Sequence, residues 1–95
     1  MDCNNYSYIN YGTKNKLIKR YDDGDHFVEI SEECNWFQDR YFTVWSDLED
    51  SDGEWYLETF DFTLTPNTRR KALNRAKAAY NRLVGKINMK RRICA

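Results

Sequence analysis

The chain has 95 residues, of which 41% are apolar and 16% aromatic, and its 15 acids balance its 15 bases. This length is typical of a single domain over residues 1–95, and the apolar content excludes whole-chain disorder. There is no run of about 18 apolar residues, which excludes a transmembrane helix, and we expect no membrane partner. The first residues, MDCNNYSYINYG, lack the basic and apolar regions of a signal peptide, so we expect a cytoplasmic protein.

The zero net charge hides a strong polarity along the chain. Residues 1–62 carry all 15 acids and five bases, a net charge of −10, whereas residues 63–95 carry ten bases and no acid, a net charge of +10. Either the two halves neutralise each other across the fold, or one of them forms a surface for a charged partner.

The cysteines Cys3, Cys34 and Cys94 are odd in number and widely spaced, and His26 is the only histidine. Disulfide frameworks and zinc sites usually contain cysteines in even, clustered sets. We therefore expect three reduced thiols, and we predict neither a metal site nor a cofactor.

Alternating apolar and polar residues predict strands through the first two thirds of the chain. The predicted segments are an edge strand at 6–11, within a stretch at 1–13 that is otherwise flexible, and strands at 16–21, 26–31, 40–46 and 54–62. Asp23-Gly24 predicts a two-residue hairpin turn, because glycine tolerates the positive φ that such turns need. The stretch EECNWFQD, residues 32–39, is predicted to form a loop or a short helical turn.

Residues 66–84 have the pattern of an amphipathic helix, in which Thr65 is a suitable N-cap and Pro66 suits the first helical position. The apolar stripe consists of Leu73, Ala76, Tyr80, Leu83, Val84 and Ile87. The opposite side is basic and consists of Lys71, Arg75, Arg82 and Lys86. Either Gly85 ends the helix, or the helix continues into the basic tail at residues 88–95.

These elements predict an α+β domain, in which an antiparallel sheet of three to five strands carries one long helix on one face. Alternation assigns two sets of residues to the two faces of the sheet. One set is Phe42, Val44, Tyr56, Phe60 and Phe62, and the other is Trp45, Trp55 and Leu57. Both sets are apolar, so one face is expected to pack on the helix and the other to be available to a partner.

The stretch SDLEDSDGEW, residues 46–55, holds five acids, and no base occurs between Arg40 and Arg69. It does not match a calcium-binding loop, because Leu48 falls at the position of the first ligand when Gly53 takes the glycine position. A solvated hairpin tip and a surface that imitates nucleic acid for a cationic partner remain as interpretations. The predicted partner-binding residues are Asp47, Glu49, Asp50, Asp52, Glu54, Trp45 and Trp55.

His26 beside Asp25, together with Cys34, is a combination that nucleophilic catalysis can use. However, the segment DDGDH is more typical of a turn, and the chain has no phosphate loop, Gly-rich fingerprint or Gly-x-Ser-x-Gly motif. We expect a protein without enzymatic activity.

The basic helix favours nucleic-acid binding as an alternative. Residues 68–83, TRRKALNRAKAAYNRL, resemble the last helix of double-stranded-RNA-binding domains, and the matching positions are Thr68, Arg69, Arg70, Ala72 and Ala76. The strand YFTVW resembles the first strand of that family. The resemblance implies phosphate contacts from Arg69, Arg70, Lys71, Arg75 and Arg82. The acidic loop between the strands departs from the family pattern.

The acidic run at 47–54, the aromatic strands at 41–45 and 55–62 and the helix at 66–84 resemble the pattern of small phage-encoded inhibitors of bacterial defence, anti-CRISPR proteins in particular. No motif defines that group. The resemblance implies a non-enzymatic inhibitor that blocks a nucleic-acid-binding surface of a defence nucleoprotein in the host bacterial cytoplasm. We predict this function, with the double-stranded nucleic-acid-binding module as the alternative and a structural homodimer through the second apolar face as a third class.

Overall fold

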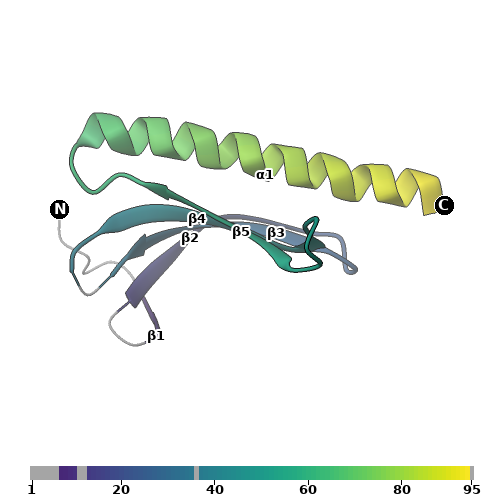
Figure 1. Cartoon of the computed structure of the whole chain (residues 1–95), viewed down its shortest axis with the longest axis horizontal. Coiled ribbons are helices and arrows are strands. Elements are labelled where there is room, and N and C mark those ends of the chain that lie inside the picture. Colours follow the sequence, from purple (N-terminus) through teal and green to yellow (C-terminus); the bar gives the residue numbers. More distant parts are fainter. Residues whose placement is uncertain (1–6, 11–12, 36, 95) are drawn as a thin grey trace.

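The computed structural model describes residues 7–10, 13–35 and 37–94, which form one antiparallel sheet with one long helix across it (Figure 1). In chain order the elements are β1 (Ser7–Asn10), β2 (Thr13–Asp22), β3 (Phe27–Cys34), β4 (Arg40–Glu49), β5 (Trp55–Asp61) and α1 (Pro66–Cys94). The five strands lie side by side in the same order. The predicted α+β architecture is confirmed.

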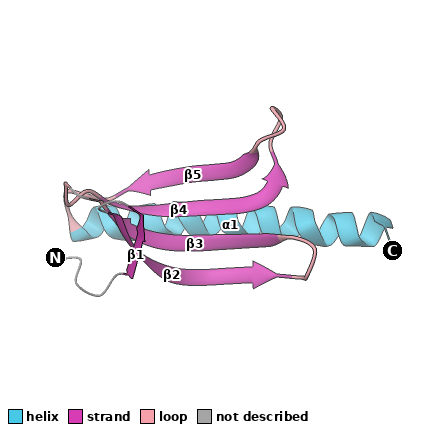
Figure 2. Ribbon diagram, turned by 90° about the horizontal axis from the view of Figure 1, so that it is seen from below, coloured by secondary structure: helices cyan, strands magenta, loops and turns pink. Residues whose placement is uncertain are grey.

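The hydrophobic core lies between α1 and one face of the sheet, which we call the covered face. Val28 and Ile30 of β3 and Phe42 and Val44 of β4 are 0% exposed. Phe42 also stacks on Phe62, with the ring centroids 4.7 Å apart. Side chains two residues apart lie on the same side of a strand, and for this reason the alternation in the sequence identifies the residues of this face correctly. Figure 2 shows the sheet from its other side, which we call the open face, with α1 behind the strands.

The helix begins where the sequence predicts, because the Thr68 N–H donates to Thr65 Oγ1 at 3.1 Å and Thr65 thereby caps the first turn. The residues of α1 that are buried against the sheet are Ala72, Ala76, Ala79, Tyr80, Leu83 and Ile87. The three alanines allow the helix to lie close to the strands, and Tyr80, Leu83 and Ile87 fill the space further along. None of the helices in the described part of the chain is long and apolar enough to cross a membrane.

The helix does not end at Gly85 but continues to Cys94, so it is longer than residues 66–84 and the predicted alternative, continuation into the basic tail, is confirmed. Residues 88–94 of the predicted tail are therefore helical. A glycine inside a helix costs about 1 kcal/mol relative to alanine. Ile87, two residues further on, is 0% exposed, and burial of such a side chain contributes about 1.5–3 kcal/mol. Tertiary packing of Ile87 therefore outweighs the local preference of Gly85.

Two loops differ from their predictions. The β2–β3 hairpin has a four-residue loop, residues 23–26, in place of the predicted two-residue turn. Its backbone N–H groups are bound by side chains, since Asp22 accepts from Gly24 at 2.8 Å and Asp23 accepts from His26 at 2.8 Å. The second loop is shorter than predicted, because β3 continues through residues 32–34, which were expected to lie in a loop or helical turn.

The predicted edge strand at residues 6–11 is observed as β1, Ser7–Asn10, which pairs with the start of β2. Tyr6 and Tyr11, the ends of the prediction, lie outside the described residues. In Figures 1 and 2, β1 lies on the side of the sheet opposite to α1.

Candidate protein-binding surface

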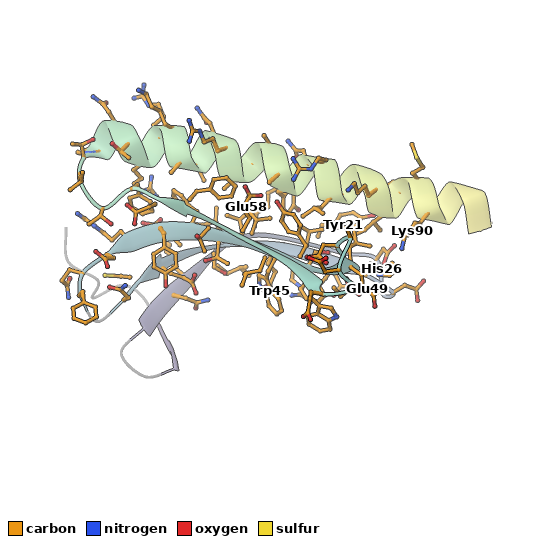
Figure 3. The ribbon with its side chains drawn as sticks, viewed as in Figure 1. Tyr21, His26, Trp45, Glu49, Glu58 and Lys90 are labelled. Atoms are coloured by element: carbon orange, nitrogen blue, oxygen red, sulfur yellow. The ribbon has the colours of Figure 1, made fainter. Side chains whose placement is uncertain are left out.

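The open face of the sheet carries apolar side chains that no element of the fold covers completely. Leu17 of β2 is 53% exposed, and on β5 Trp55 is 57% and Leu57 68% exposed. Trp45 of β4 points to the same side, away from the helix (Figure 3). The predicted division of the sheet residues between two faces is thus confirmed, and the face with Trp45, Trp55 and Leu57 is the one that the helix leaves free.

Three aromatic rings form a cluster on this face, which we call the aromatic cluster (Phe27, Trp45 and Trp55). Phe27 meets Trp45 edge to face, with the centroids 4.7 Å apart, and Trp45 lies 6.1 Å from Trp55. The Trp45 Nε1–H donates to Glu29 Oε2 at 2.7 Å, and this bond fixes the orientation of the indole. Large amphipathic rings held in one orientation are typical anchors of protein interfaces.

One cation is already bound beside the aromatic cluster. The Arg20 guanidinium lies over the Phe27 ring at 4.7 Å and pairs with Asp22 and Glu29. The hydrogen bond to Asp22 is the main cause of the raised pKa of Arg20, and the Gly24 N–H is the main cause of the lowered pKa of Asp22. This part of the open face therefore holds a guanidinium group between an aromatic ring and two carboxylates.

A cavity of about 370 Å³ opens on the same face, and it is lined by Asn15, Glu29, Ser31, Glu33, Thr43, Trp45 and Leu57. Glu33 accepts a hydrogen bond from the Thr43 hydroxyl, and burial raises the pKa of its carboxyl. In the described part of the chain, no cation forms an ion pair with Glu33. The cavity therefore combines a half-buried carboxyl group with an indole, the two groups that bind a lysine or arginine side chain well.

The acidic stretch divides into carboxylates that hold the fold and carboxylates that face solvent. The Asp47 side chain is 19% exposed, accepts from the Phe27 N–H at 2.9 Å and lies 3.0 Å from His26 Nδ1. Asp50 Oδ1 accepts the N–H of Asp52 at 2.8 Å and closes the turn. Asp47 and Asp50 are therefore occupied within the β4–β5 hairpin. The exposed acids of this hairpin tip are Glu49, Asp50, Asp52 and Glu54, of which Asp50 also closes the turn.

β4 has a bulge beside Asp47, where the register with β5 shifts between Ser46 and Glu49. Ser46 Oγ donates to the Phe27 carbonyl at 2.7 Å and accepts the Leu48 N–H at 3.1 Å. Asp47 contacts the start of β3, and Leu48 is buried in the same alternation as Phe42 and Val44. A strict alternation read from the sequence does not contain this shift.

The basic residues predicted for nucleic-acid binding do not act as one group. Arg69 Nη2 donates to Glu32 Oε1 at 2.6 Å, and Glu32 is only 2% exposed. Arg82 Nη2 donates to the Tyr56 hydroxyl at 3.0 Å and lies over its ring. The remaining three residues of that set, Arg70, Lys71 and Arg75, are exposed along α1. The two halves of the chain thus neutralise each other in part, through the pair of Arg69 with Glu32.

The residues considered for catalysis lie apart. His26 stands at the start of β3 beside Asp47, whereas Cys34 ends the same strand, eight residues or about 26 Å away at the rise of an extended strand. Cys34 is in a disulfide bond, so the prediction of three reduced thiols is wrong. Among the described residues no group of three or more His, Cys, Asp or Glu side chains is arranged to hold a metal ion.

Glu29, Glu33 and Phe27 belong to the candidate surface, but the sequence prediction did not include them. The signal was present, because residues 27, 29, 31 and 33 share one face of β3, opposite to Val28 and Ile30. For Glu33 the signal is hidden by the prediction of a loop or helical turn at residues 32–39, whereas Phe27 and Glu29 lie within the predicted strand. Comparison with protein families, curated proteins and solved structures finds no match for the chain.

Proposed function

We propose that the chain is a non-enzymatic, anti-CRISPR-like inhibitor that binds a bacterial defence nucleoprotein and blocks its nucleic-acid-binding surface. The observation that carries this proposal is the open face, where exposed Trp55 and Leu57 adjoin the cavity with Glu33. Nucleic-acid-binding surfaces are rich in lysine and arginine. The carboxylates would pair with these cations, and the aromatic cluster would supply the desolvated anchors.

The acidic tip supports the same partner chemistry. Glu49, Asp52 and Glu54 are exposed at the end of the open face, and their negative potential would attract a cationic surface at long range. Asp47 and Asp50 also contribute to the fold, because their carboxylates accept backbone N–H groups. A test by charge reversal should therefore be confined to Glu49, Asp52 and Glu54, because changes at Asp47 and Asp50 would disturb the hairpin itself.

The proposal is tested by affinity capture from bacteria that contain RNA-guided defence complexes. The variant Glu33→Gln/Trp55→Ser/Leu57→Ser removes the proposed contacts, and Arg70→Gln/Asn74→Ala on the outer side of α1 is the matched control. We expect the natural chain and the control to capture a nucleoprotein that target nucleic acid then displaces, and the open-face variant to capture none. Equal capture by the open-face variant would contradict the proposal.

Direct binding of double-stranded nucleic acid is the second candidate, and the exposed Arg70, Lys71 and Arg75 favour it. Two of the five predicted cations are occupied within the fold, because Arg69 pairs with Glu32 and Arg82 donates to the Tyr56 hydroxyl. A gel shift with duplex RNA and DNA at low salt separates the candidates, because only a direct binder shifts the duplex. A homodimer through the open face would instead double the mass in light scattering.

Action in the bacterial cytoplasm belongs to the same proposal. Disulfides are rare in reducing compartments, so the disulfide at Cys34 is the feature that weighs against this location. A count of free thiols in protein taken from the cytoplasm under acid quench tests it. Full reduction of Cys34 without loss of the fold is the expected result, and protein that folds only when oxidised would contradict a cytoplasmic location.

A further inference from the structure

The outer edge of β5 is unpaired, since β5 is the last strand of the sheet and pairs only with β4 among the described strands. The Phe62 N–H donates to the Arg40 carbonyl at 2.8 Å, which continues the β4–β5 register. In an antiparallel pair, the backbone groups of successive residues point alternately towards and away from the neighbour. The N–H and C=O groups of Leu57, Thr59 and Asp61 therefore point outwards, away from β4.

Apart from Glu58 and Asp61, this edge has few of the features by which proteins usually prevent strand addition. Residues 55–61, WYLETFD, contain no Lys, Arg or Pro, and the pairing with β4 is regular from Tyr56 to Asp61. By contrast, β2 has a register shift between Leu17 and Lys19 and several cations along it. The long, regular edge of β5 is thus a template on which another extended segment can pair.

A row of cations on α1 lies above this edge, and we call it the basic row (Lys71, Arg75, Arg82 and Lys86). Lys71 and Arg75 line a cavity of about 360 Å³ together with Thr59, Phe60 and Asp61 of β5. Arg82 donates to the Tyr56 hydroxyl, and Lys86 follows Arg82 one turn later on the same side. An added strand would lie about 4.8 Å outside β5, within reach of these long side chains.

The acids of β5 neutralise the basic row only in part. Glu58 lies on the helix side of the strand, as Figure 3 shows, and accepts a hydrogen bond from Tyr56. The Asp61 carboxylate accepts from the Thr63 N–H at 3.0 Å and from the Thr63 hydroxyl at 2.9 Å. Within the described part of the chain, the ion pairs that form involve neither Lys71, Arg75 nor Lys86.

We propose that β5 accepts an extended segment of a partner protein as a sixth strand, with acidic side chains facing the basic row and apolar side chains on the open face. The acids would pair with Lys71, Arg75 and Lys86, and the apolar residues would extend the surface of Trp55 and Leu57. A second copy of this chain is a poor occupant, because pairing of β5 with β5 would bring two basic rows together. This inference is independent of the proposed inhibitor function, since it concerns the edge and the helix.

The probe is a synthetic peptide of about nine residues that alternates valine and glutamate, which is long enough to span β5. The same peptide with lysine in place of glutamate, and a single-stranded oligonucleotide of similar charge, are the comparisons. We expect the glutamate peptide to bind and the lysine peptide not to bind, as measured by fluorescence anisotropy. We also expect the oligonucleotide to compete poorly, because it cannot form the backbone hydrogen bonds of a strand.

Two pairs of variants separate strand addition from simple attraction of charge. Thr59→Pro removes an outward N–H and is expected to weaken peptide binding at least about tenfold, whereas Thr59→Val is expected to leave it unchanged. Lys71→Glu/Arg75→Glu is expected to abolish binding, whereas Arg70→Glu, on the other flank of α1, is expected to keep it. Equal binding to Thr59→Pro and Thr59→Val, or tighter binding of the oligonucleotide than of the peptide, would overturn the proposal.

Hydrogen exchange on the natural chain gives a test that does not depend on the folding of any variant. The glutamate peptide is expected to slow the exchange of the amides of Leu57, Thr59 and Asp61, because their N–H groups would then be bonded. Exchange of these three amides that stays as fast with saturating peptide as without it would also overturn the proposal.

Discussion

The two faces of the sheet have similar apolar sequences but opposite environments. Phe42 on the covered face is 0% exposed, whereas Leu57 on the open face is 68% exposed. Alternation alone does not distinguish them, because both faces carry aromatic and aliphatic residues at a spacing of two. The difference arises from α1, whose apolar stripe fits over one face only. The covered face therefore stabilises the fold, and the open face is the surface to which we propose that a partner binds.

The largest expected difference between the faces is in stability. Phe42→Ala creates a cavity beside Phe62, and we expect it to lower the free energy of unfolding by about 3–5 kcal/mol. Leu57→Ala is expected to change it by less than about 0.5 kcal/mol, because Leu57 is exposed. Chemical denaturation followed by circular dichroism measures both values. A large loss for Leu57→Ala would show that the open face is part of the core.

The basic residues of α1 should show a similar contrast. Arg69→Ala removes the cation beside the buried Glu32 carboxylate, and we expect a loss of about 2–3 kcal/mol. The expected loss of stability is smaller than that for a fully buried ion pair, because the Arg69 side chain is 37% exposed. The neighbouring Arg70→Ala should change stability by less than about 0.5 kcal/mol. Equal losses in denaturant titrations of the two variants would contradict the assignment of Arg69 to the fold.

The acids of the β4–β5 hairpin should also differ in their effect on stability. Asp47→Ala removes the acceptor of the Phe27 N–H, and we expect the free energy of unfolding to fall by about 1–3 kcal/mol. Asp52→Ala, at the exposed tip, should be close to neutral. Thermal unfolding of the two variants under identical conditions makes the comparison. If Asp52→Ala were the more harmful change, the division of the acids given above would be wrong.

The smallest expected effect concerns Glu33 and pH. Burial raises the pKa of its carboxyl, so the folded chain holds this proton more tightly than the unfolded chain does. The folded state consequently loses stability as pH rises from about 4.3, the ordinary value of a glutamate, through the raised pKa. Glu33→Gln should be slightly more stable than the natural chain at pH 7 and not at pH 3. A difference in unfolding free energy that is the same at both pH values would contradict this.

The order and type of the elements could be predicted from the sequence because each depends on local patterns. Thr65 and Pro66 start the helix, alternation marks β4 and β5, and Gly24 marks a hairpin. The deviations arise where tertiary contacts overrule these patterns. Burial of Ile87 carries the helix past Gly85, and the Asp22 and Asp23 carboxylates hold a longer hairpin loop than Asp23-Gly24 requires.

The candidate surface was only partly predictable for the same reason. The exposure of Trp55 and Leu57 follows from alternation once the position of α1 is known. The bond of Asp47 to the Phe27 N–H joins β4 to β3, and the cavity with Glu33 depends on the pairing of Glu33 with Tyr41 across β3 and β4. Such pairings join residues distant in the sequence, and no local pattern contains them.

The most direct test of the open face as a binding surface compares two variants, one changed on the open face and one on α1. Their affinities for the nucleoprotein that the natural chain captures are measured after both are shown to be equally stable. We expect Trp55→Ser/Leu57→Ser to weaken binding at least about 100-fold, as is common when anchors at the centre of an interface are lost. Arg70→Gln/Asn74→Ala, on the outer side of α1, should bind as the natural chain does. The opposite result, with binding lost in the helix variant and kept in the open-face variant, would contradict the account.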